Sequence, residues 1–275
     1  MVHRILIVTA VAAEADSVSA GLAAVATPAP EHVPLPGGLA LRRHADGDRA
    51  RVDVLVGGVG PASVAAATGT ALAYASLTGG EGEGERGAEH DAEHGADRGE
   101  RPHDPPYDLV VSAGIAGGFQ PAAPLGSLVV SSAIVAADLG AETPDGYLAV
   151  EELGFGRSVH PVSGALTGRI AAALAAGGVP CAVAPVLTVS TVTGSARRAA
   201  ELAERHPGAA AEAMEGFGVA EAAAAYGVPV VELRAVSNAV GPRDRAAWRI
   251  GDALDALRRG VPLLGRTVFV EAPCT

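Results

Sequence analysis

Three polar side chains close mostly apolar segments of this chain: Glu14, Glu215 and Asn238. Glu14 follows the run 5–13, Glu215 lies among small residues, and Asn238 follows the segment 230–236. An unpaired carboxylate in apolar surroundings is costly, so Glu215 requires donors, and the hydroxyls of a vicinal diol would supply two. The alternative for Glu215 is a carboxylate at a helix N-terminus, where it complements the helix dipole.

A glycine-rich stretch, 114–118, follows the apolar segment 108–113. Glycines in this position let backbone N–H groups approach an oxygen-rich ligand, although a tight turn at a sheet edge explains them equally well. The chain contains no lysine, which excludes the Gly-Lys-Ser/Thr loop of P-loop nucleotidases. It also has no Gly-x-Ser-x-Gly elbow, so hydrolysis by acyl transfer is not expected.

A second glycine-rich turn is close to a dinucleotide-binding fingerprint. The segment 58–63 follows an apolar run and precedes a helix-forming stretch, but Ser63 stands where the fingerprint has its third glycine. The acidic residue that such a site needs, about 20 positions later, would fall where no strand is expected. A nicotinamide or flavin site is therefore not expected, and no cofactor is predicted.

Strands and helices alternate along most of the chain. Strands are expected at 4–9, 39–43, 51–56, 108–113, 127–137, 182–190 and 230–236, and helices at 10–22, 62–77, 163–176, 196–204 and 248–259, with Ser163 capping the third helix; 27–38 and most of 139–162 are expected to be loop. This pattern predicts an α/β fold, a three-layer α/β/α sandwich with a mixed, largely parallel central sheet. Ligands of open α/β sheets bind beyond the carboxyl ends of strands, which is where the three polar residues lie.

Composition narrows the function classes. The net charge of −11 disfavours nucleic-acid and anionic-membrane partners. Cys181 and Cys274 have neither metal nor redox spacing, and together with the short, interrupted apolar run at the N-terminus they suggest a cytoplasmic protein without a bound metal. Segment 78–106 carries nine acidic residues against three arginines and almost no apolar residue, so we expect it to be a disordered insertion.

Four motifs, in this order, resemble the nucleoside phosphorylase/nucleosidase family: Thr9 to Glu14, Ser112 to Gly118, Ala213-Met214-Glu215 and Arg234 to Asn238. The resemblance implies one nucleosidase domain over 1–275, N-glycosidic hydrolysis without a cofactor or metal, a small-molecule nucleoside substrate and a homo-oligomer. The closing segment 237–250 is similar to members that act on futalosine, which implies release of hypoxanthine in menaquinone biosynthesis.

The same resemblance assigns roles to residues. Glu14 would activate the attacking water, Glu215 would accept hydrogen bonds from the ribose 2′- and 3′-hydroxyls, and Met214 would pack under the ribose. Asn238 would donate to N7 and O6 of a 6-oxopurine, whereas relatives that cleave adenine nucleosides usually carry Asp there. An asparagine that only caps the strand end is the alternative.

The remaining expected substrate contacts are Ala113, Gly114 and Ser237. Val192 stands where the family often has an aromatic residue that stacks on the base, and Phe217 is a weak substitute for it. Arg243, Arg245 or Arg249 is a candidate partner for the benzoate carboxylate of futalosine, with Trp248 or Phe217 against the benzoate ring. Solvated cap arginines are the alternative.

Three other functions remain open. One is a methylthioadenosine/S-adenosylhomocysteine nucleosidase, and another is a non-catalytic nucleoside-binding protein, which would have no need of Glu14. The third is a purine nucleoside phosphorylase, which binds phosphate and usually uses arginine for it. Segments 10–21 and 114–119 contain no arginine, so only Arg43 or Arg51 would reach such a site from elsewhere.

Overall fold

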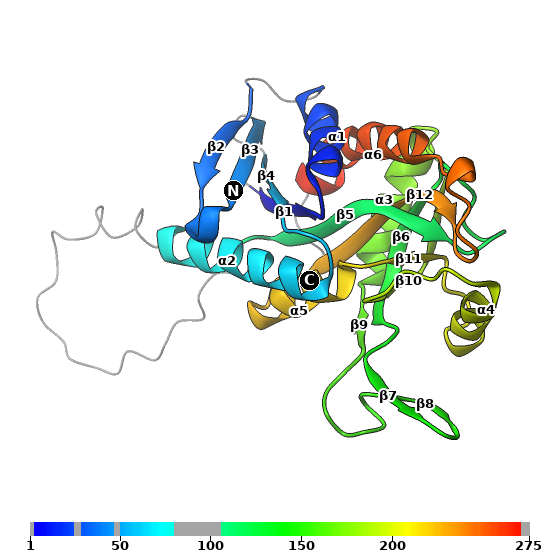
Figure 1. The fold of residues 1–275 in the computed structure, drawn as a ribbon. Helices are drawn as coiled ribbons and strands as arrows, with labels where there is room; N and C mark the ends of the chain where they lie inside the picture. Colours follow the sequence, from blue (N-terminus) through cyan, green and yellow to red (C-terminus); the bar gives the residue numbers. More distant parts are fainter. Residues whose placement is uncertain (1–2, 25–28, 47–49, 80–105, 271–275) are drawn as a thin grey trace, which may run out of the picture.

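The computed structural model describes residues 3–24, 29–46, 50–79 and 106–270. A ten-stranded mixed sheet lies between two layers of helices (Figure 1). The predicted fold class is confirmed. The strands are β1 His3–Thr9, β2 Glu31–Pro34, β3 Ala40–Asp46, β4 Ala50–Val56, β5 Leu109–Gly118, β6 Leu128–Ala136, β9 Val159–Pro161, β10 Cys181–Thr188, β11 Ala211–Ala213 and β12 Val230–Ala239.

The centre of the sheet is parallel. Strands β4, β1, β5 and β12 are neighbours in that order and all run the same way. Their residues are buried almost without interruption, as expected for parallel strands that are covered on both faces. Antiparallel pairs lie at the margins, where β3 joins β4 and β6 joins β12. The carboxyl ends of the parallel strands therefore meet at one edge.

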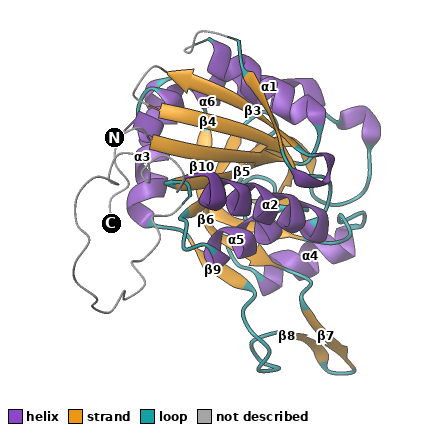
Figure 2. Cartoon of the chain, turned by 90° about the vertical axis from the view of Figure 1, so that its left-hand side faces the viewer, coloured by secondary structure: helices purple, strands orange, loops and turns teal. Residues whose placement is uncertain are grey.

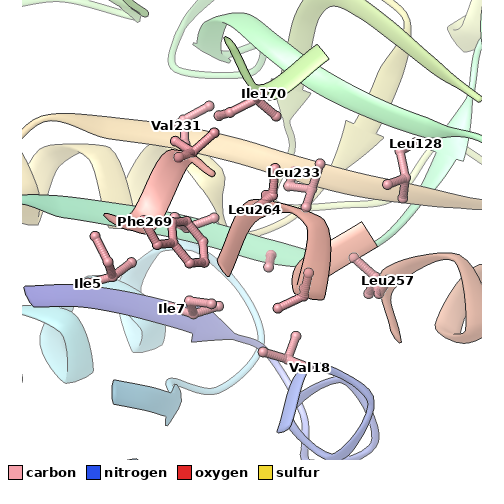
Figure 3. Packing of buried hydrophobic residues seen from close by; sticks show 14 of the residues in the cluster. Ile5, Ile7, Val18, Leu128, Ile170, Val231, Leu233, Leu257, Leu264 and Phe269 are labelled. Atoms are coloured by element: carbon pink, nitrogen blue, oxygen red, sulfur yellow. The ribbon is translucent and has the colours of Figure 1, made fainter. Parts of the chain in front are cut away.

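One face of the sheet is covered by α1 Ala12–Ala23, α3 Gly164–Ala176 and α6 Ile250–Gly265. Figure 3 shows Val18, Leu257 and Leu264 of these helices and Phe269 packed against β1, β6 and β12. The other face carries α2 Pro61–Gly79 and α5 Gly216–Ala225, which pack on each other and on the sheet (Figure 2). Burial of these two apolar layers holds the sheet edge in place.

The short strand β11 closes part of the sheet on itself. It pairs with β10 in parallel and with β5 in antiparallel orientation, so β5, β12, β6, β10 and β11 form a ring. Glu212 of β11 lies opposite Gly117 of β5, which on its other side lies opposite Asn238 of β12. Sequence patterns did not predict β11, because three residues are too few to show a period.

Several predicted boundaries were wrong. Residues 27–38 were expected to be loop, but β2 forms there, because pairing with β3 supplies its hydrogen bonds and an edge strand tolerates Pro34. The stretch 114–118 was expected to be a turn, yet it continues β5, because β12 and β11 pair with these glycines. Ser163 occupies the N-cap of α3 without a side-chain hydrogen bond to the helix.

The region 139–162 contains more strand than expected. Hairpin β7 Gly140–Thr143 and β8 Gly146–Ala149 projects from the body of the molecule in both views (Figures 1 and 2), and β9 pairs with β6. The fourth helix, α4 Ala196–Arg205, agrees with the prediction. The acidic insertion predicted at 78–106 lies almost entirely outside the described residues. None of the helices in the described ranges is long and apolar enough to cross a membrane.

Candidate functional site

Glu14 joins the start of α1 to strand β5. Its side chain is buried, and Oε2 accepts from the backbone N–H groups of Ala10 at 2.9 Å and Val11 at 3.2 Å. Oε1 accepts from the N–H of Ile115 at 2.8 Å. A carboxylate in the first turn of a helix also complements the helix dipole. Three backbone donors therefore fix this carboxylate just beyond the carboxyl end of β1, beside the second half of β5.

Arg234 is a fully buried arginine in the apolar strand β12. Its Nε lies 2.7 Å from Oε1 of Glu232, two residues earlier on the same face, and its Nη1 lies 3.2 Å from Oε2 of Glu215. Nη2 donates to Oγ of Ser112 at 3.2 Å. Burial by itself lowers the pKa of Arg234, but the nearby carboxylates of Glu232, Glu215 and Glu14 outweigh it and raise that pKa above its ordinary value.

Glu215 lies two residues after the end of β11 and stands at the N-cap of α5. Besides Arg234, Oε1 accepts from the N–H of Gly60 at 3.2 Å and Oε2 accepts from the N–H of Met214 at 3.3 Å. The turn that resembles a dinucleotide fingerprint therefore serves to hold this carboxylate. A carboxylate offers about four lone pairs and these three donors occupy three of them, so Glu215 keeps one for a ligand's hydroxyl.

Gly114 lets the two charged groups approach β5. A Cβ added to it would lie 2.6 Å from Arg234 Nη1 and 2.6 Å from Glu14 Oε1. Three carboxylates, from Glu14, Glu215 and Glu232, thus surround one guanidinium. A cluster with this excess of negative charge suits a group that becomes cationic during reaction.

Asn238 lies further along β12, opposite Gly117, which is three residues beyond Gly114 on β5. The β12–β5 register shifts between Val236 and Asn238, an irregularity of the kind that re-aims side chains next to active sites. Ser237 Oγ lies 2.9 Å from Asn238 Oδ1, and Asn238 Nδ2 donates to the carbonyl of Ala239 at 3.0 Å. Because only the amide nitrogen donates to a carbonyl, these contacts set the orientation of the amide and leave one N–H of Nδ2 for a ligand.

A cavity of about 80 Å³ adjoins this amide. Glu212 and Thr193 form one wall, and Trp248 with Arg243 forms another. The Arg243 guanidinium lies 5.3 Å from the centroid of the Trp248 ring. The complete lining is Gly117, Val192, Thr193, Glu212, Asn238, Ala239, Gly241, Pro242, Arg243 and Trp248.

The other predicted site residues are placed differently. Ala113 points into the apolar core beneath the site. Phe217 packs beside His160, with ring centroids 5.1 Å apart, and lines a separate cavity of about 520 Å³ with Glu221, Val150 and Phe155. Met214 is half-buried beside Glu215. The structure thus brings Val192, Arg243 and Asn238 to one cavity. Arg234 contacts Glu215 and lies close enough to Glu14 to feel its charge, while Phe217 lies apart from Asn238.

Three buried charged residues around the site received no role from sequence reasoning: Arg234, Glu232 and Glu212. Glu232 and Arg234 have a recognisable pattern, because two opposite charges at alternate positions of an apolar strand share one face. Glu212 has a weaker one, since it is a lone acid between alanines. Thr193 donates to it from both N–H and Oγ1, with the N–H at 2.8 Å.

The arginines considered for a phosphate site lie elsewhere. Arg43 Nε is 2.9 Å from Asp53 Oδ1, and Arg51 Nε is 3.6 Å from Oδ2 of the same buried carboxylate. In the β1–β4 register, Arg51 lies opposite Arg4 at the beginning of β1, whereas Glu14 follows the other end of β1. The five residues of strand between the two ends cover about 17 Å. Neither arginine therefore shares the Glu14 cluster. In the described ranges no group of three or more His, Cys, Asp or Glu residues is arranged to hold a metal ion.

Comparison with known proteins places this chain in a family. Residues 4–268 match the model of the phosphorylase superfamily. The chain is 55% identical over 258 residues to a futalosine hydrolase from Streptomyces coelicolor, covering 94% of this chain and 93% of the relative. It is 41% identical over 260 residues to a futalosine hydrolase from Acidothermus cellulolyticus, covering 94% and 89%.

Solved structures share the fold. Futalosine hydrolase of Helicobacter pylori matches with a TM-score of 0.72 at 16% identity, over 97% of this chain and 98% of that one. A methylthioadenosine/S-adenosylhomocysteine nucleosidase from Colwellia psychrerythraea, in complex with adenine, matches with a TM-score of 0.70 at 18% identity, over 97% and 96%. At these identities the likeness concerns the fold.

Proposed function

The chain belongs to the phosphorylase superfamily, and we propose that it is a futalosine hydrolase, an enzyme that cleaves the N-glycosidic bond of futalosine and releases hypoxanthine. The observation that carries the proposal is the placement of a neutral amide, Asn238 of β12, near the carboxylate cluster: its β5 partner Gly117 lies three residues beyond Gly114, the partner of Arg234. Three strand residues cover about 10 Å, a distance that a purine riboside spans.

The ribose lies at the carboxylate cluster in this proposal. Water attacks C1′ while the bond to N9 breaks, and the sugar passes through an oxocarbenium-like state. Glu14 orients the water and takes its proton, while Glu215 accepts hydrogen bonds from the 2′- and 3′-hydroxyls. Both contacts strengthen as positive charge develops on the ring, which is the condition for acceleration. No cofactor or metal enters these steps.

The base lies at the cavity beside Asn238. The electron pair of the broken bond moves onto the purine, where N7 and O6 gain negative charge. Asn238 Nδ2 has one N–H free for these acceptors, and its orientation is set by Ser237. A neutral amide donates without a change of protonation, which suits a 6-oxopurine. Trp248 lines this cavity together with Val192, so it supplies an aromatic ring where Val192 has none.

Water is favoured over phosphate as the nucleophile. Arg234 already contacts Glu232 and Glu215, so an incoming phosphate would compete with two buried carboxylates. Arg43 and Arg51 are bound to Asp53 away from the cluster. Negative charge around Glu14 repels a phosphate dianion and leaves a water molecule unaffected.

The test is incubation with futalosine, inosine and methylthioadenosine, with and without phosphate, followed by chromatography of the free base. The proposal expects hypoxanthine from futalosine at a rate that phosphate does not change. Adenine from methylthioadenosine as the main product would overturn the substrate assignment. A ribose 1-phosphate product that requires phosphate would overturn the hydrolytic mechanism.

The proposal includes a homo-oligomer that works in the cytoplasm. Phe155 is 81% exposed near the projecting β7–β8 hairpin, and Leu139, Leu148 and Val159 are also exposed around it. A cluster of apolar side chains of this kind is typical of a protein–protein interface. Light scattering on a sizing column should give at least twice the mass of 27.2 kDa, and Phe155→Ser should reduce it; a monomer at micromolar concentration would overturn this part.

A further inference from the structure

Glu212 is a buried carboxylate that none of the steps above uses. Its side chain is only 5% exposed, yet it lines the same cavity as Asn238. The N–H of Thr193 donates to Oε1 and the Thr193 hydroxyl donates to Oε2. A carboxylate with two oxygens and about four lone pairs keeps acceptor capacity after these two bonds, and that capacity is available on the cavity side.

The sheet places Glu212 and Asn238 on either side of one glycine. Gly117 of β5 lies opposite Glu212 on β11 and opposite Asn238 on β12. Residues opposite each other in neighbouring strands project to the same face, and two strand spacings separate their Cα atoms by about 10 Å. A Cβ on Gly117 would lie 3.0 Å from Val240 Cγ2 and 3.3 Å from Asn238 Nδ2, so a side chain at this position would crowd the Asn238 amide.

We propose that Glu212 determines base specificity by accepting a hydrogen bond from N1–H of a 6-oxopurine while Asn238 donates to the O6/N7 edge. The inference rests on the proposed function and names the base chemistry that the site selects. Hypoxanthine and adenine have opposite hydrogen-bond donor and acceptor groups at two adjacent positions, N1 and the substituent on C6. Hypoxanthine presents O6 as an acceptor and N1–H as a donor, whereas adenine presents a 6-amino donor and N1 as an acceptor.

A carboxylate facing N1 therefore attracts one base and repels the other. Against adenine, the lone pair of N1 would meet the lone pairs of Glu212, and both groups would lose their solvent without gaining a hydrogen bond. Sites built to pair with an N–H or O–H of the substrate reject analogues that lack it by about 10⁴-fold. Asn238 and Glu212 together match the donor–acceptor order of the 6-oxopurine edge.

A structural role is the competing explanation, in which Glu212 only ties the loop at Thr193 to β11. The variant Glu212→Gln separates the two. Its amide oxygen can keep the bond from the Thr193 N–H, and its NH₂ group can donate to the Thr193 hydroxyl, which then accepts. Toward the cavity, however, the variant offers a donor in place of an acceptor.

The experiment measures kcat/KM of the wild type and Glu212→Gln for futalosine and for the same riboside with a 6-amino group. We expect the ratio of 6-oxo to 6-amino activity to fall by about 100-fold or more, mostly through the loss on futalosine. Inhibition constants for hypoxanthine, 1-methylhypoxanthine and adenine give a second readout. Wild type should bind hypoxanthine better than its N1-methyl analogue, and the variant should lose that preference.

Glu204→Gln, an exposed acid on α4, is the matched control and should leave the ratio unchanged. If Glu212→Gln does not fold, Glu212→Asp keeps the charge and should retain 6-oxo preference at reduced activity. Equal losses on both ribosides, or no loss, would overturn the inference while leaving the proposed function intact. A wild type that does not hydrolyse futalosine would overturn the proposed function itself.

Discussion

Nη1 of Arg234 lies 3.2 Å from Oε2 of Glu215, so the carboxylate proposed to bind the ribose hydroxyls is held by a buried cation from the neighbouring strand β12. The same guanidinium contacts Glu232, whose carboxylate is completely buried. Burial raises the pKa of Glu232, although the adjacent Arg234 acts in the opposite direction. Arg234 thus compensates the negative charge of these buried carboxylates, and in the proposed mechanism it does not touch the N-glycosidic bond.

Arg234→Met is expected to destabilise the protein by about 3–5 kcal/mol, because it leaves Glu232 buried without a partner. Urea unfolding followed by circular dichroism measures this change. The double variant Arg234→Met with Glu232→Leu should recover part of the stability but not the activity, since Glu215 still lacks its support. A single variant as stable as wild type would contradict the assigned role of Arg234.

Gly114→Ala is expected to lower kcat by 10-fold or more, because its Cβ would lie 2.6 Å from both Glu14 Oε1 and Arg234 Nη1. Displacing a catalytic group by about 1 Å costs about 100-fold in rate. Gly69→Ala is the matched control, since nothing lies within 4 Å of the added atom in helix α2, and it should add about 0.5–1 kcal/mol of stability without loss of activity. Similar kinetics for the two variants would argue against the close approach at β5.

Glu14→Gln should reduce kcat by about 10²–10⁴-fold, because the amide cannot take a proton from water. Binding of hypoxanthine, measured by calorimetry, should change little, since the base contacts lie at Asn238. Asp16→Asn, an exposed change on the same helix, serves as the control. Unchanged turnover would exclude Glu14 as the group that takes the proton from water, whereas a wild type that binds the base without any turnover would favour a nucleoside-binding protein.

Asn238→Asp should lower kcat/KM for futalosine at neutral pH, because the new carboxylate has no proton to donate to O6 and N7 of the base. The expected loss is about 5- to 150-fold, the cost of leaving a buried acceptor of the substrate unpaired. Activity on the 6-amino riboside should rise relative to futalosine as the pH is lowered and the new Asp becomes protonated. Ser237→Ala, which frees the amide to rotate, should cause a smaller loss on futalosine with no change in base preference. An unchanged profile for Asn238→Asp would remove this residue from base recognition.

Activity on futalosine should rise with pH through a pKa above the ordinary value of a glutamic acid. Burial raises the pKa of Glu212, whereas the donors of Thr193 and the charge of Arg198 lower it and Asp138 raises it. The ionised form accepts from N1–H more strongly than the protonated form, so this acidic limb of the kcat/KM profile should be present in the wild type and absent in Glu212→Gln. If the acidic limb lay at the same pH in the wild type and in Glu212→Gln, its titration would belong to a group other than Glu212.

The same raised pKa has a consequence for folding. A carboxyl group whose pKa is raised in the folded state contributes stability that is present below its unfolded pKa and is lost as the pH rises through the folded pKa. The free energy of unfolding of Glu212→Gln relative to wild type should therefore increase as the pH rises from the unfolded-state pKa of Glu212 through its folded-state pKa. Chemical unfolding at several pH values from 4 upward measures it, and a pH-independent difference would contradict the shift.

The sequence by itself determined the alternation of strands and helices, because apolar periodicity is local, and it determined the three residues that close strands at one edge. It also contained Glu232 and Arg234 on one face of β12, but nothing local says that a guanidinium will meet Glu215, which precedes it by 19 positions.

Only the tertiary structure decided the pairing of β11 with β5, since hydrogen bonds between strands far apart in the chain depend on how the whole sheet closes. That closure places Glu212 and Asn238 on either side of Gly117. In the folded chain Trp248 lines the cavity beside Asn238, whereas Phe217 lines a different cavity. Residue types fix which chemistry a chain can perform, whereas long-range pairing fixes which of those residues face each other.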